Sequence, residues 1–390
     1  GGVIMPPLQY AEDFGTDTKF RLIEIPAELE GDIEAGAALS FIGVDDDSMM
    51  LCSAEKSYSV KVASTSNTLY ITDAATTADG VNVEGEGPIT VLGAATSVLE
   101  VSRSAPRLER LAELLRAVPF CGEIGLDAGA ATGVPWYTLA SEVQASPGEL
   151  RAGLDAMNAF EYGGRWQVMD EQYATDKLSL ILTSAVAEGW SLDHLDVAAV
   201  TASMQEHDAP EVVVATLLRQ YGKLAAQGDA TEAAAAGPAD GGGAAAVAAG
   251  QPKAQTVFAL DSEGVCRFEA IKLLKMSARW PMESFMQQWA DVVPDSMDPH
   301  FEQLRGIALA CETGAEGTEM EVVYFPASDL PIDPKKRVAA LFSFRAVWAG
   351  DDIKPYLADI AVGGVTVDKI LFKHARAFNG DDGTRLYNKR

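Results

Sequence analysis

The stretch from Tyr137 to Met169 constrains the fold most, because its local signals agree on one supersecondary unit. Ser146-Pro147-Gly148-Glu149 places a capping hydroxyl, a proline and a carboxylate where the first turn of a helix uses them, so a helix is expected to begin there. Leu150, Leu154 and Met157 then recur at helical spacing and form one apolar face. The segment therefore predicts an amphipathic helix with a well-marked start.

A second helix is expected just before this one, and a β-hairpin just after it. Leu139 and Val143 lie one helical turn apart, and only Ala145-Ser146 separates them from the capped helix. After the capped helix, apolar residues alternate on both sides of Gly163-Gly164, a dipeptide that tolerates the positive φ angles of a tight hairpin turn. Two helices joined by a short turn and followed by a hairpin make a winged helix.

The same order of elements recurs along the chain. Hairpin turns are expected near four glycines, Gly163, Gly228, Gly314 and Gly380, at spacings of 65, 86 and 66 residues. The middle spacing contains residues 228–254, which hold 12 alanines and 6 glycines and are expected to be disordered because they can bury little apolar surface. In the third copy, the second helix is expected to carry Phe301, Leu304 and Ile307. Without the insert, the period of roughly 60 to 65 residues predicts tandem winged helices.

Residues 19–103 differ from the rest, because many short apolar runs alternate with turn-rich segments. A helical turn or two is expected within Pro26–Ile33, and separate short strands are expected at Tyr58–Val62, Thr68–Ile71, Ile89–Leu92 and Val98–Val101, among others. This pattern predicts a small barrel or sandwich. Its strand edges are either covered by a partner subunit or closed within the domain, and both alternatives stay open at this point.

The predicted fold class is α+β and multidomain, with an N-terminal β-rich, barrel-like domain followed by tandem winged-helix domains. We expect a β-rich assembly domain in residues 1–104 and a first winged helix in 105–170. A second winged helix, carrying the insert, is expected in 171–265, and a C-terminal winged-helix region of one or two units in 266–390.

Charge is distributed unevenly, since the chain has a net charge of −27 but residues 335–390 hold 11 basic and 6 acidic side chains. Only this end has the sign that suits phosphate. Lys369, Lys373 and Arg376 share one expected helical face, although a solvated helix face is the alternative. The first winged helix instead carries Glu149 and Asp155 on its second helix, which favours protein contact. The predicted DNA-binding residues are Lys335, Lys336, Arg337, Lys369, Lys373, Arg376, Arg385, Lys389 and Arg390.

The sequence offers no catalytic, cofactor or metal motif that can be defended. The four cysteines and four histidines show no metal-ligand spacing, and the Ser53-x-x-Lys56 match to a nucleophile pair is coincidental. Walker A and GxGxxG loops and paired catalytic carboxylates are not found. We therefore expect no enzyme, no cofactor and no metal site, together with a reduced intracellular compartment and no membrane span.

Several short motifs, in the same order, resemble a known family. The family is Dcc, "defective in sister chromatid cohesion", and the resemblance spans nearly the whole chain apart from the Ala/Gly insert. Its most specific motif is Thr65-Ser66-Asn67-Thr68-Leu69. The others are Phe20–Glu24, Ile42-Gly43, Leu51–Ser53, Lys56–Tyr58, Gln144–Ser146, Gly163–Trp166, Tyr221–Lys223, Gln303–Gly306, Leu341–Arg345, Asp352–Tyr356 and Tyr387–Arg390.

The resemblance implies a specific set of partners. Such proteins are nuclear subunits of an alternative replication factor C complex, which loads or unloads the sliding clamp PCNA in replication and sister chromatid cohesion. The N-terminal domain, with Thr65, Ser66, Asn67, Thr68 and Leu69 as its predicted partner-binding residues, would assemble with a large ATPase subunit and a small third subunit. The winged helices would contact single- or double-stranded DNA and the catalytic part of DNA polymerase epsilon.

Two further readings remain open from the sequence. A tandem winged-helix transcription regulator would fold alone, dimerise and prefer one DNA sequence. Alternatively, all the winged helices bind protein only, and the basic end is solvated surface.

Overall fold

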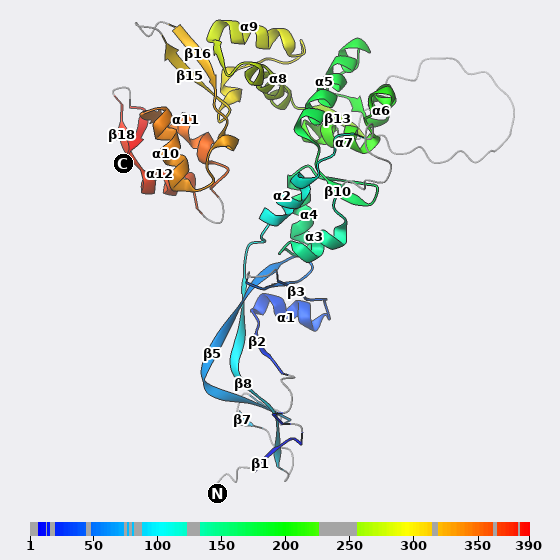
Figure 1. Cartoon of the computed structure of the whole chain (residues 1–390), viewed down its shortest axis with the longest axis vertical. Helices are drawn as coiled ribbons and strands as arrows, with labels where there is room; N and C mark the ends of the chain where they lie inside the picture. Colours follow the sequence, from blue (N-terminus) through cyan, green and yellow to red (C-terminus); the bar gives the residue numbers. More distant parts are fainter. Residues whose placement is uncertain are drawn as a thin grey trace, which may run out of the picture. The chain divides into compact units, whose positions relative to one another are not determined.

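The computed structural model (Figure 1) describes residues 7–12, 14–15, 20–43, 48–73, 76–77, 80–81, 88–122, 133–225, 256–313, 319–361, 365–380 and 383–390. The chain forms two compact units, one of residues 1–121 and 126–170, the other of residues 122–125 and 171–390. The helices of the described ranges include none with the length and apolar character that a bilayer crossing requires. The predicted α+β class is confirmed. The Ala/Gly insert 228–254 lies outside the described residues.

The first compact unit opens with a six-stranded sheet in the order β1-β8-β5-β4-β3, with β2 also paired to β8. Two long strands dominate it, and they run side by side in Figure 1. A small core of Leu29, Leu51, Tyr58, Val60 and Val101 lies between the sheet and α1. The elements are β1 (Leu8–Tyr10), β2 (Leu22–Glu24), α1 (Ala27–Glu34), β3 (Ser40–Ile42), β4 (Met50–Cys52), β5 (Ser57–Thr72), β6 (Thr76–Thr77), β7 (Gly80–Val81) and β8 (Ile89–Arg103).

This sheet corrects two expectations. The short strands expected at Tyr58–Val62 and Thr68–Ile71 are parts of one 16-residue strand, and those at Ile89–Leu92 and Val98–Val101 are parts of one 15-residue strand. The polar residues between the apolar runs do not end a strand, because the ladder is made by backbone groups. Its register merely shifts, once between Ser64 and Leu69 and once between Ile71 and Thr72. In addition, the described strands form an open sheet and not a closed barrel.

A helix–hairpin repeat follows in residues 107–169, which we call the first repeat. Its elements are α2 (Glu109–Ala117), α3 (Trp136–Glu142), α4 (Pro147–Ala156), β9 (Phe160–Tyr162) and β10 (Arg165–Gln167), and an isolated bridge joins Val134 to Trp166. The predicted capping box is confirmed, because the Ser146 hydroxyl accepts from Glu149 N at 3.2 Å and the Glu149 carboxylate accepts from Ser146 N at 3.3 Å. The hairpin turn at Gly163 and Gly164 is also confirmed, with φ angles of +59° and +75°.

Three more repeats make up most of the second compact unit, at residues 171–260, 262–324 and 334–389. Each contains a leading helix, a short strand, two or three further helical elements and two strands, and in each sheet the last strand lies in the middle. The second repeat comprises α5 (Glu171–Ala187), β11 (Leu195–Asp196), α6 (Val197–Ser203), η1 (Gln205–His207), α7 (Glu211–Gln220), β12 (Gly222–Leu224) and β13 (Val257–Leu260). The third comprises α8 (Ser262–Met276), β14 (Arg279–Pro281), α9 (Met282–Val292), η2 (Phe301–Leu304), β15 (Ala308–Thr313) and β16 (Glu319–Tyr324).

The third repeat departs from the expected helix through Phe301, Leu304 and Ile307. Only one 3₁₀ turn, η2, forms there. Gly306 has a φ of +81°, which no helical residue adopts, so the helix ends before Ile307 and the chain turns into β15. The expected turn at Gly314 lies outside the described residues.

The fourth repeat follows η3 (Ala327–Asp329) and comprises α10 (Pro334–Phe344), β17 (Val347–Ala349), α11 (Gly350–Ile353), η4 (Lys354–Leu357), α12 (Val367–His374), β18 (Ala375–Asn379) and β19 (Arg385–Lys389). Its core includes one residue of the third repeat, because Leu309 of β15 packs with Trp348 and Tyr356. The Arg345 guanidinium also donates to Ala310 O at 2.7 Å. The third and fourth repeats therefore have separate sheets and separate cores, which meet at β15, where Ala308 packs into the core of the third repeat and Leu309 into that of the fourth.

Candidate nucleic-acid interface and assembly edge

Helix α12 carries two basic residues of the fourth repeat, Lys369 and Lys373. The Thr366 hydroxyl caps it by accepting from Lys369 N at 3.3 Å. Ile370 and Leu371 anchor the helix in the core, while the side chains of Asp368, Lys369, Phe372 and Lys373 are exposed. Helical phase thus separates an apolar face from a charged one, and a single aromatic ring lies on the charged face.

A cavity of about 840 Å³ opens beside this helix. Its lining combines five basic residues with one acidic residue and several apolar ones: Lys354, Asp368, Lys369, Leu371, Phe372, Ala375, Arg376, Ala377, Arg385, Tyr387 and Arg390. The acidic residue neutralises little of this charge, because the ion pair between Lys354 Nζ and the exposed Asp368 carboxylate is long, at 4.0 Å. The lining therefore has a clear excess of positive charge.

The end of the chain is tied to the end of α12. One nitrogen of the Arg390 guanidinium donates to the carbonyl oxygens of Phe372 and Lys373, each at 3.2 Å. These carbonyls lie in the last turn of the helix, where they have no partner within it, so the arginine caps the helix and complements its dipole. β19 brings Arg385 to the same place, with its guanidinium 6.0 Å from the Tyr387 ring centre.

The pKa of His374 responds to its burial and to the charges of this region. Its pKa is lowered below the ordinary value, first by burial and then by the nearby cation Lys373. Lys335 and Arg390 lower the pKa further, and Asp333 alone raises it. The imidazole is therefore surrounded by more positive than negative charge, as a phosphate-binding surface requires.

The structure brings together four of the nine predicted DNA-binding residues around the cavity, namely Lys369, Arg376, Arg385 and Arg390. The helical face expected for Lys369, Lys373 and Arg376 is wrong for Arg376, because α12 ends at His374 and Arg376 lies on β18. Lys373 and Lys389 are exposed on α12 and β19, and Lys335 and Lys336 are exposed in the first turn of α10. Among the other lining residues, Lys354 and Phe372 have side chains suited to a nucleic-acid ligand, and the sequence did not point to them. Lys354 belongs to η4 and has no periodic relation to α12, so only the fold brings it there; Phe372 was hidden because an aromatic residue on a helix is usually core.

Arg337 corrects the prediction. Its side chain is 1% exposed and donates to three backbone carbonyls, Pro331 O at 2.7 Å, Tyr356 O at 3.0 Å and Leu330 O at 3.2 Å. It also forms an ion pair with Asp359. The side chain lies on the same face of α10 as Val338 and Leu341, so helical phase buries it while its neighbours Lys335 and Lys336 stay exposed. Arg337 stabilises the repeat and cannot reach a phosphate.

The predicted partner-binding residues lie on β5, at the register shift between Ser64 and Leu69. Thr65 is half-buried, and Ser66, Asn67, Thr68 and Leu69 are exposed. β4 accompanies β5 only as far as the bond from Val60 N to Met49 O, so the described residues place no strand on that edge of β5 from Lys61 to Thr72. An edge of this length exposes a row of backbone donors and acceptors.

Apolar side chains along the same strand add to this edge. Val62 is 70% exposed, and Leu69 and Tyr70 are also exposed, as are Leu8 and Tyr10 of β1. A long edge with exposed apolar residues is a template for pairing with another chain. We call Lys61–Thr72 the assembly edge.

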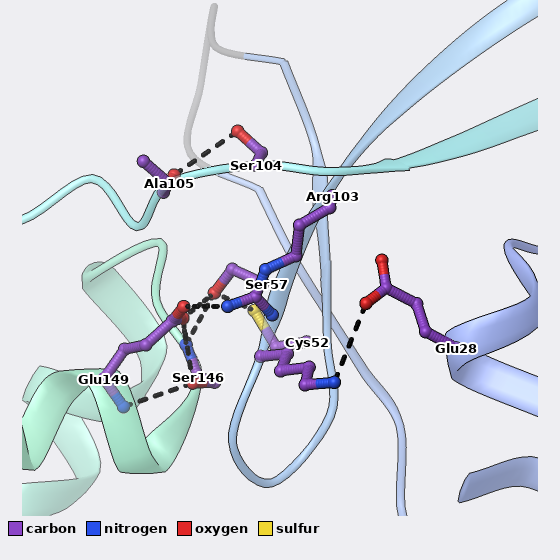
Figure 2. A network of polar contacts seen from close by, with 9 residues as sticks. Glu28, Cys52, Ser57, Arg103, Ser104, Ala105, Ser146 and Glu149 are labelled. Carbon is purple, nitrogen blue, oxygen red and sulfur yellow. Dashed lines mark hydrogen bonds and ion pairs between the residues drawn. The ribbon is translucent and has the colours of Figure 1, made fainter. Parts of the chain in front are cut away.

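The other end of β5 binds the first repeat, as Figure 2 shows. One carboxylate oxygen of Glu149 accepts from the hydroxyls of Ser57 at 2.5 Å and Ser146 at 2.9 Å, and the other lies 3.3 Å from the Arg103 guanidinium. Gly148 N donates to Ala54 O at 2.9 Å, in the turn between β4 and β5. The N-terminus of α4 is therefore covered by the sheet, which makes the first repeat an extension of the N-terminal domain.

Comparison with known proteins agrees with the motifs along the chain. The family described as "Sister chromatid cohesion protein Dcc1" matches residues 20–357. Proteins named sister chromatid cohesion protein DCC1 from Danio rerio and Homo sapiens are 28% and 26% identical, over 99% and 95% of this chain and 94% and 88% of theirs. A probable sister chromatid cohesion protein DCC1 of Dictyostelium discoideum is 25% identical over 97% of this chain and 96% of its own length. The match covers well over half of the chain and confirms the resemblance, so this chain belongs to the Dcc1 family.

Proposed function

We propose that this chain is a non-catalytic subunit of an alternative replication factor C complex, which loads or unloads the PCNA clamp in DNA replication and sister chromatid cohesion. Family membership supports the cohesion role, because the family and its members are named for it. In this proposal the chain acts in the nucleus as a bridge. Its N-terminal sheet binds the large ATPase subunit and the small third subunit, and its repeats contact DNA and the catalytic part of DNA polymerase epsilon.

The repeats are winged helices in this proposal. The recurring order of helix, strand, two or three helical elements and two strands, with the last strand in the middle of each sheet, supports this assignment. In such a unit the helix before the hairpin enters a groove and flanking cations hold the backbone. The fourth repeat has α12 in that position.

One observation carries the DNA role. In a chain with a net charge of −27, five basic residues from η4, α12, β18, β19 and the last residue meet around one cavity. Concentrated positive charge against an acidic background is costly unless it serves an anionic ligand, and phosphates are the anions that several arginines and lysines suit together.

The assembly edge supports the partner role. Partner strands that add to Lys61–Thr72 would satisfy its backbone groups and cover Val62 and Leu69. The open sheet would then be completed into a barrel shared between subunits. In such a shared barrel, the strands of this chain do not need to close a barrel by themselves.

The DNA role is tested with the full chain by fluorescence anisotropy on labelled DNA of unrelated sequences, single-stranded and duplex, at several salt concentrations. We expect binding that is indifferent to sequence, with log affinity falling linearly with log salt. Strong preference for one sequence would instead favour a transcription regulator. No binding to either DNA at low salt would leave the chain as a protein scaffold.

The assembly role is tested by co-expression with the two partner subunits. Val62→Lys combined with Leu69→Lys should abolish co-purification, because charges on the edge oppose strand addition. Val186→Lys is the matched control, since Val186 is similarly exposed but lies on α5. Equal recovery of both variants would contradict the assignment of the edge.

A further inference from the structure

Phe372 is a highly exposed aromatic residue that lies among basic side chains. Its side chain is 84% exposed, the highest value among the large hydrophobic side chains in the described ranges. Single exposed apolar residues are common and need no explanation. This ring, however, lies on the lining of the 840 Å³ cavity, among the cations described above.

The backbone that carries the ring is held in a defined place. Its backbone belongs to the last turn of α12, and Arg390 binds the Phe372 carbonyl at 3.2 Å. Leu371, the preceding residue, is buried and anchors the turn. The helix and the arginine thus fix the backbone from which the ring projects, which lowers the entropic cost of a ligand that stacks on it.

The surrounding cations select the ligand. Lys369 precedes Phe372 by three residues, so the two side chains are neighbours on the helix surface. Arg376 and Arg385 reach the same cavity from β18 and β19. A planar apolar ring bordered by cations matches a nucleotide with its base unstacked, since the base covers the ring and its phosphates meet the cations.

Duplex DNA fits this arrangement less well. Its base faces are already covered by neighbouring base pairs, so only the phosphates can use the site. The aromatic ring would gain nothing from a duplex interior. When an unpaired base stacks on the ring, in contrast, the face of the base and the face of the ring are both removed from water.

We propose that Phe372 is a stacking platform for an unpaired base, so that the cavity of the fourth repeat binds single-stranded DNA in preference to duplex. This inference rests on the proposed DNA-binding function and deepens it, because it names the form of DNA that the site takes. Lys369, Arg376 and Arg385 hold the flanking phosphates.

The test measures anisotropy of labelled 20-nucleotide single strands and duplexes with the full-length chain. Phe372→Ala and Phe372→Leu should each lower single-strand affinity by about tenfold, because both remove one stacked base. Duplex affinity should change less than about twofold, since phosphate contacts are kept. Phe372→Trp should restore or increase single-strand affinity.

A second ligand separates stacking from a loss of fold. A single strand with abasic positions has the same phosphates, so the unchanged chain should bind it about as weakly as Phe372→Ala binds the normal strand. On the abasic strand Phe372→Ala should have no further effect. Met276→Ala is the control variant, because Met276 is 80% exposed at the end of α8 and does not line the cavity.

The outcomes distinguish this inference from the proposed function. If the unchanged chain binds duplex and normal and abasic strands equally well, the stacking platform is refuted while DNA binding stands. If Phe372→Ala lowers the affinities for single strand and duplex equally, or changes neither affinity, the ring does not select an unpaired base. A protein partner would then be the expected ligand of the exposed ring. If the unchanged chain binds no DNA, both proposals fail.

Discussion

Helices α4 and α12 hold the same position in the first and the fourth repeat, yet their surroundings differ. The N-terminus of α4 is covered by the turn between β4 and β5, and its Glu149 is engaged by Ser57 and Arg103. The N-terminus of α12 is capped by its own Thr366, and its outer face presents Lys369 and Phe372 beside a basic cavity. One topology therefore supplies a structural junction in one place and a candidate ligand site in another. The contacts around the helix, and not the repeat, decide its use.

The largest effect is expected inside the fourth repeat, where a basic residue serves the fold. Arg337→Ala should lower the free energy of unfolding by about 3 kcal/mol, because it leaves the buried Tyr356 carbonyl and two part-buried carbonyls without their donor and a void beside Val338. Lys336→Ala should change it by less than about 0.5 kcal/mol. Urea unfolding of the full chain measures the free energy of unfolding of both variants. Similar stabilities of the two variants would show that Arg337 has no structural role.

The next effect breaks the junction at α4. Glu149→Ala removes half of the capping box and leaves the hydroxyl of the fully buried Ser57 without its acceptor, so we expect a loss of about 2 kcal/mol. Hydrogen exchange of Pro147–Ala156 should increase accordingly. Asp368→Ala is the matched change in the first turn of α12, where the carboxylate is exposed and the loss should stay below about 0.5 kcal/mol. If the two variants lose equal stability, the contrast between the helices is wrong.

A third change sharpens the comparison through binding. Lys369→Gln combined with Arg385→Gln should weaken duplex binding by about tenfold at moderate salt and reduce the slope of log affinity against log salt by about 1.8. The two side chains each provide one phosphate contact in the proposal. Arg151→Gln on α4 should leave both quantities unchanged, since that guanidinium lies 5.0 Å from the Trp136 ring centre in the first repeat. An equal effect of Arg151→Gln would place DNA on α4 as well.

The smallest effect concerns pH. Burial and nearby cations hold the pKa of His374 below its ordinary value. A bound phosphate would raise this pKa, so binding takes up protons and the affinity for DNA should increase as pH falls from about 8 to 6, by less than about fivefold. His374→Gln should flatten the profile. Without DNA, the stability of the fold depends on pH in the opposite direction. The unfolded chain binds the proton of His374 more readily than the folded chain, because the folded pKa is lowered. The free energy of unfolding should therefore decrease as pH falls below the unfolded pKa of about 6.5.

Local signals predicted local structure well. The capping box at Ser146 and the hairpin turn at Gly163-Gly164 are confirmed within the described residues. Each depends on residues within one or two turns of one another, so the chain needs no distant contact to specify it. The lengths of β5 and β8 were wrong because a strand continues wherever its backbone finds a partner, and side chains alone do not mark that partner.

The candidate site was predicted only in outline. Clustered charge near the C-terminal end pointed to Lys369, Arg376, Arg385 and Arg390, and the cavity includes all four. Three adjacent basic residues in Lys335–Arg337 suggested one common role, whereas the core selects Arg337 and leaves the two lysines in solvent. Burial is decided by the helix phase together with the segments that pack on it, and neither η4 nor the Leu330 and Pro331 carbonyls are visible from the triplet itself.

The sequence by itself determined the repeat, the starts of its best-capped helices, the uneven charge and, through its motifs, the family. These depend on composition and on spacings within a few tens of residues. Only the tertiary structure decided that α4 is covered and α12 is open, that Arg337 is structural, and that Phe372 faces a basic cavity. Such properties depend on contacts between residues far apart in the chain, whose free energy is settled by packing and burial and not by local preference.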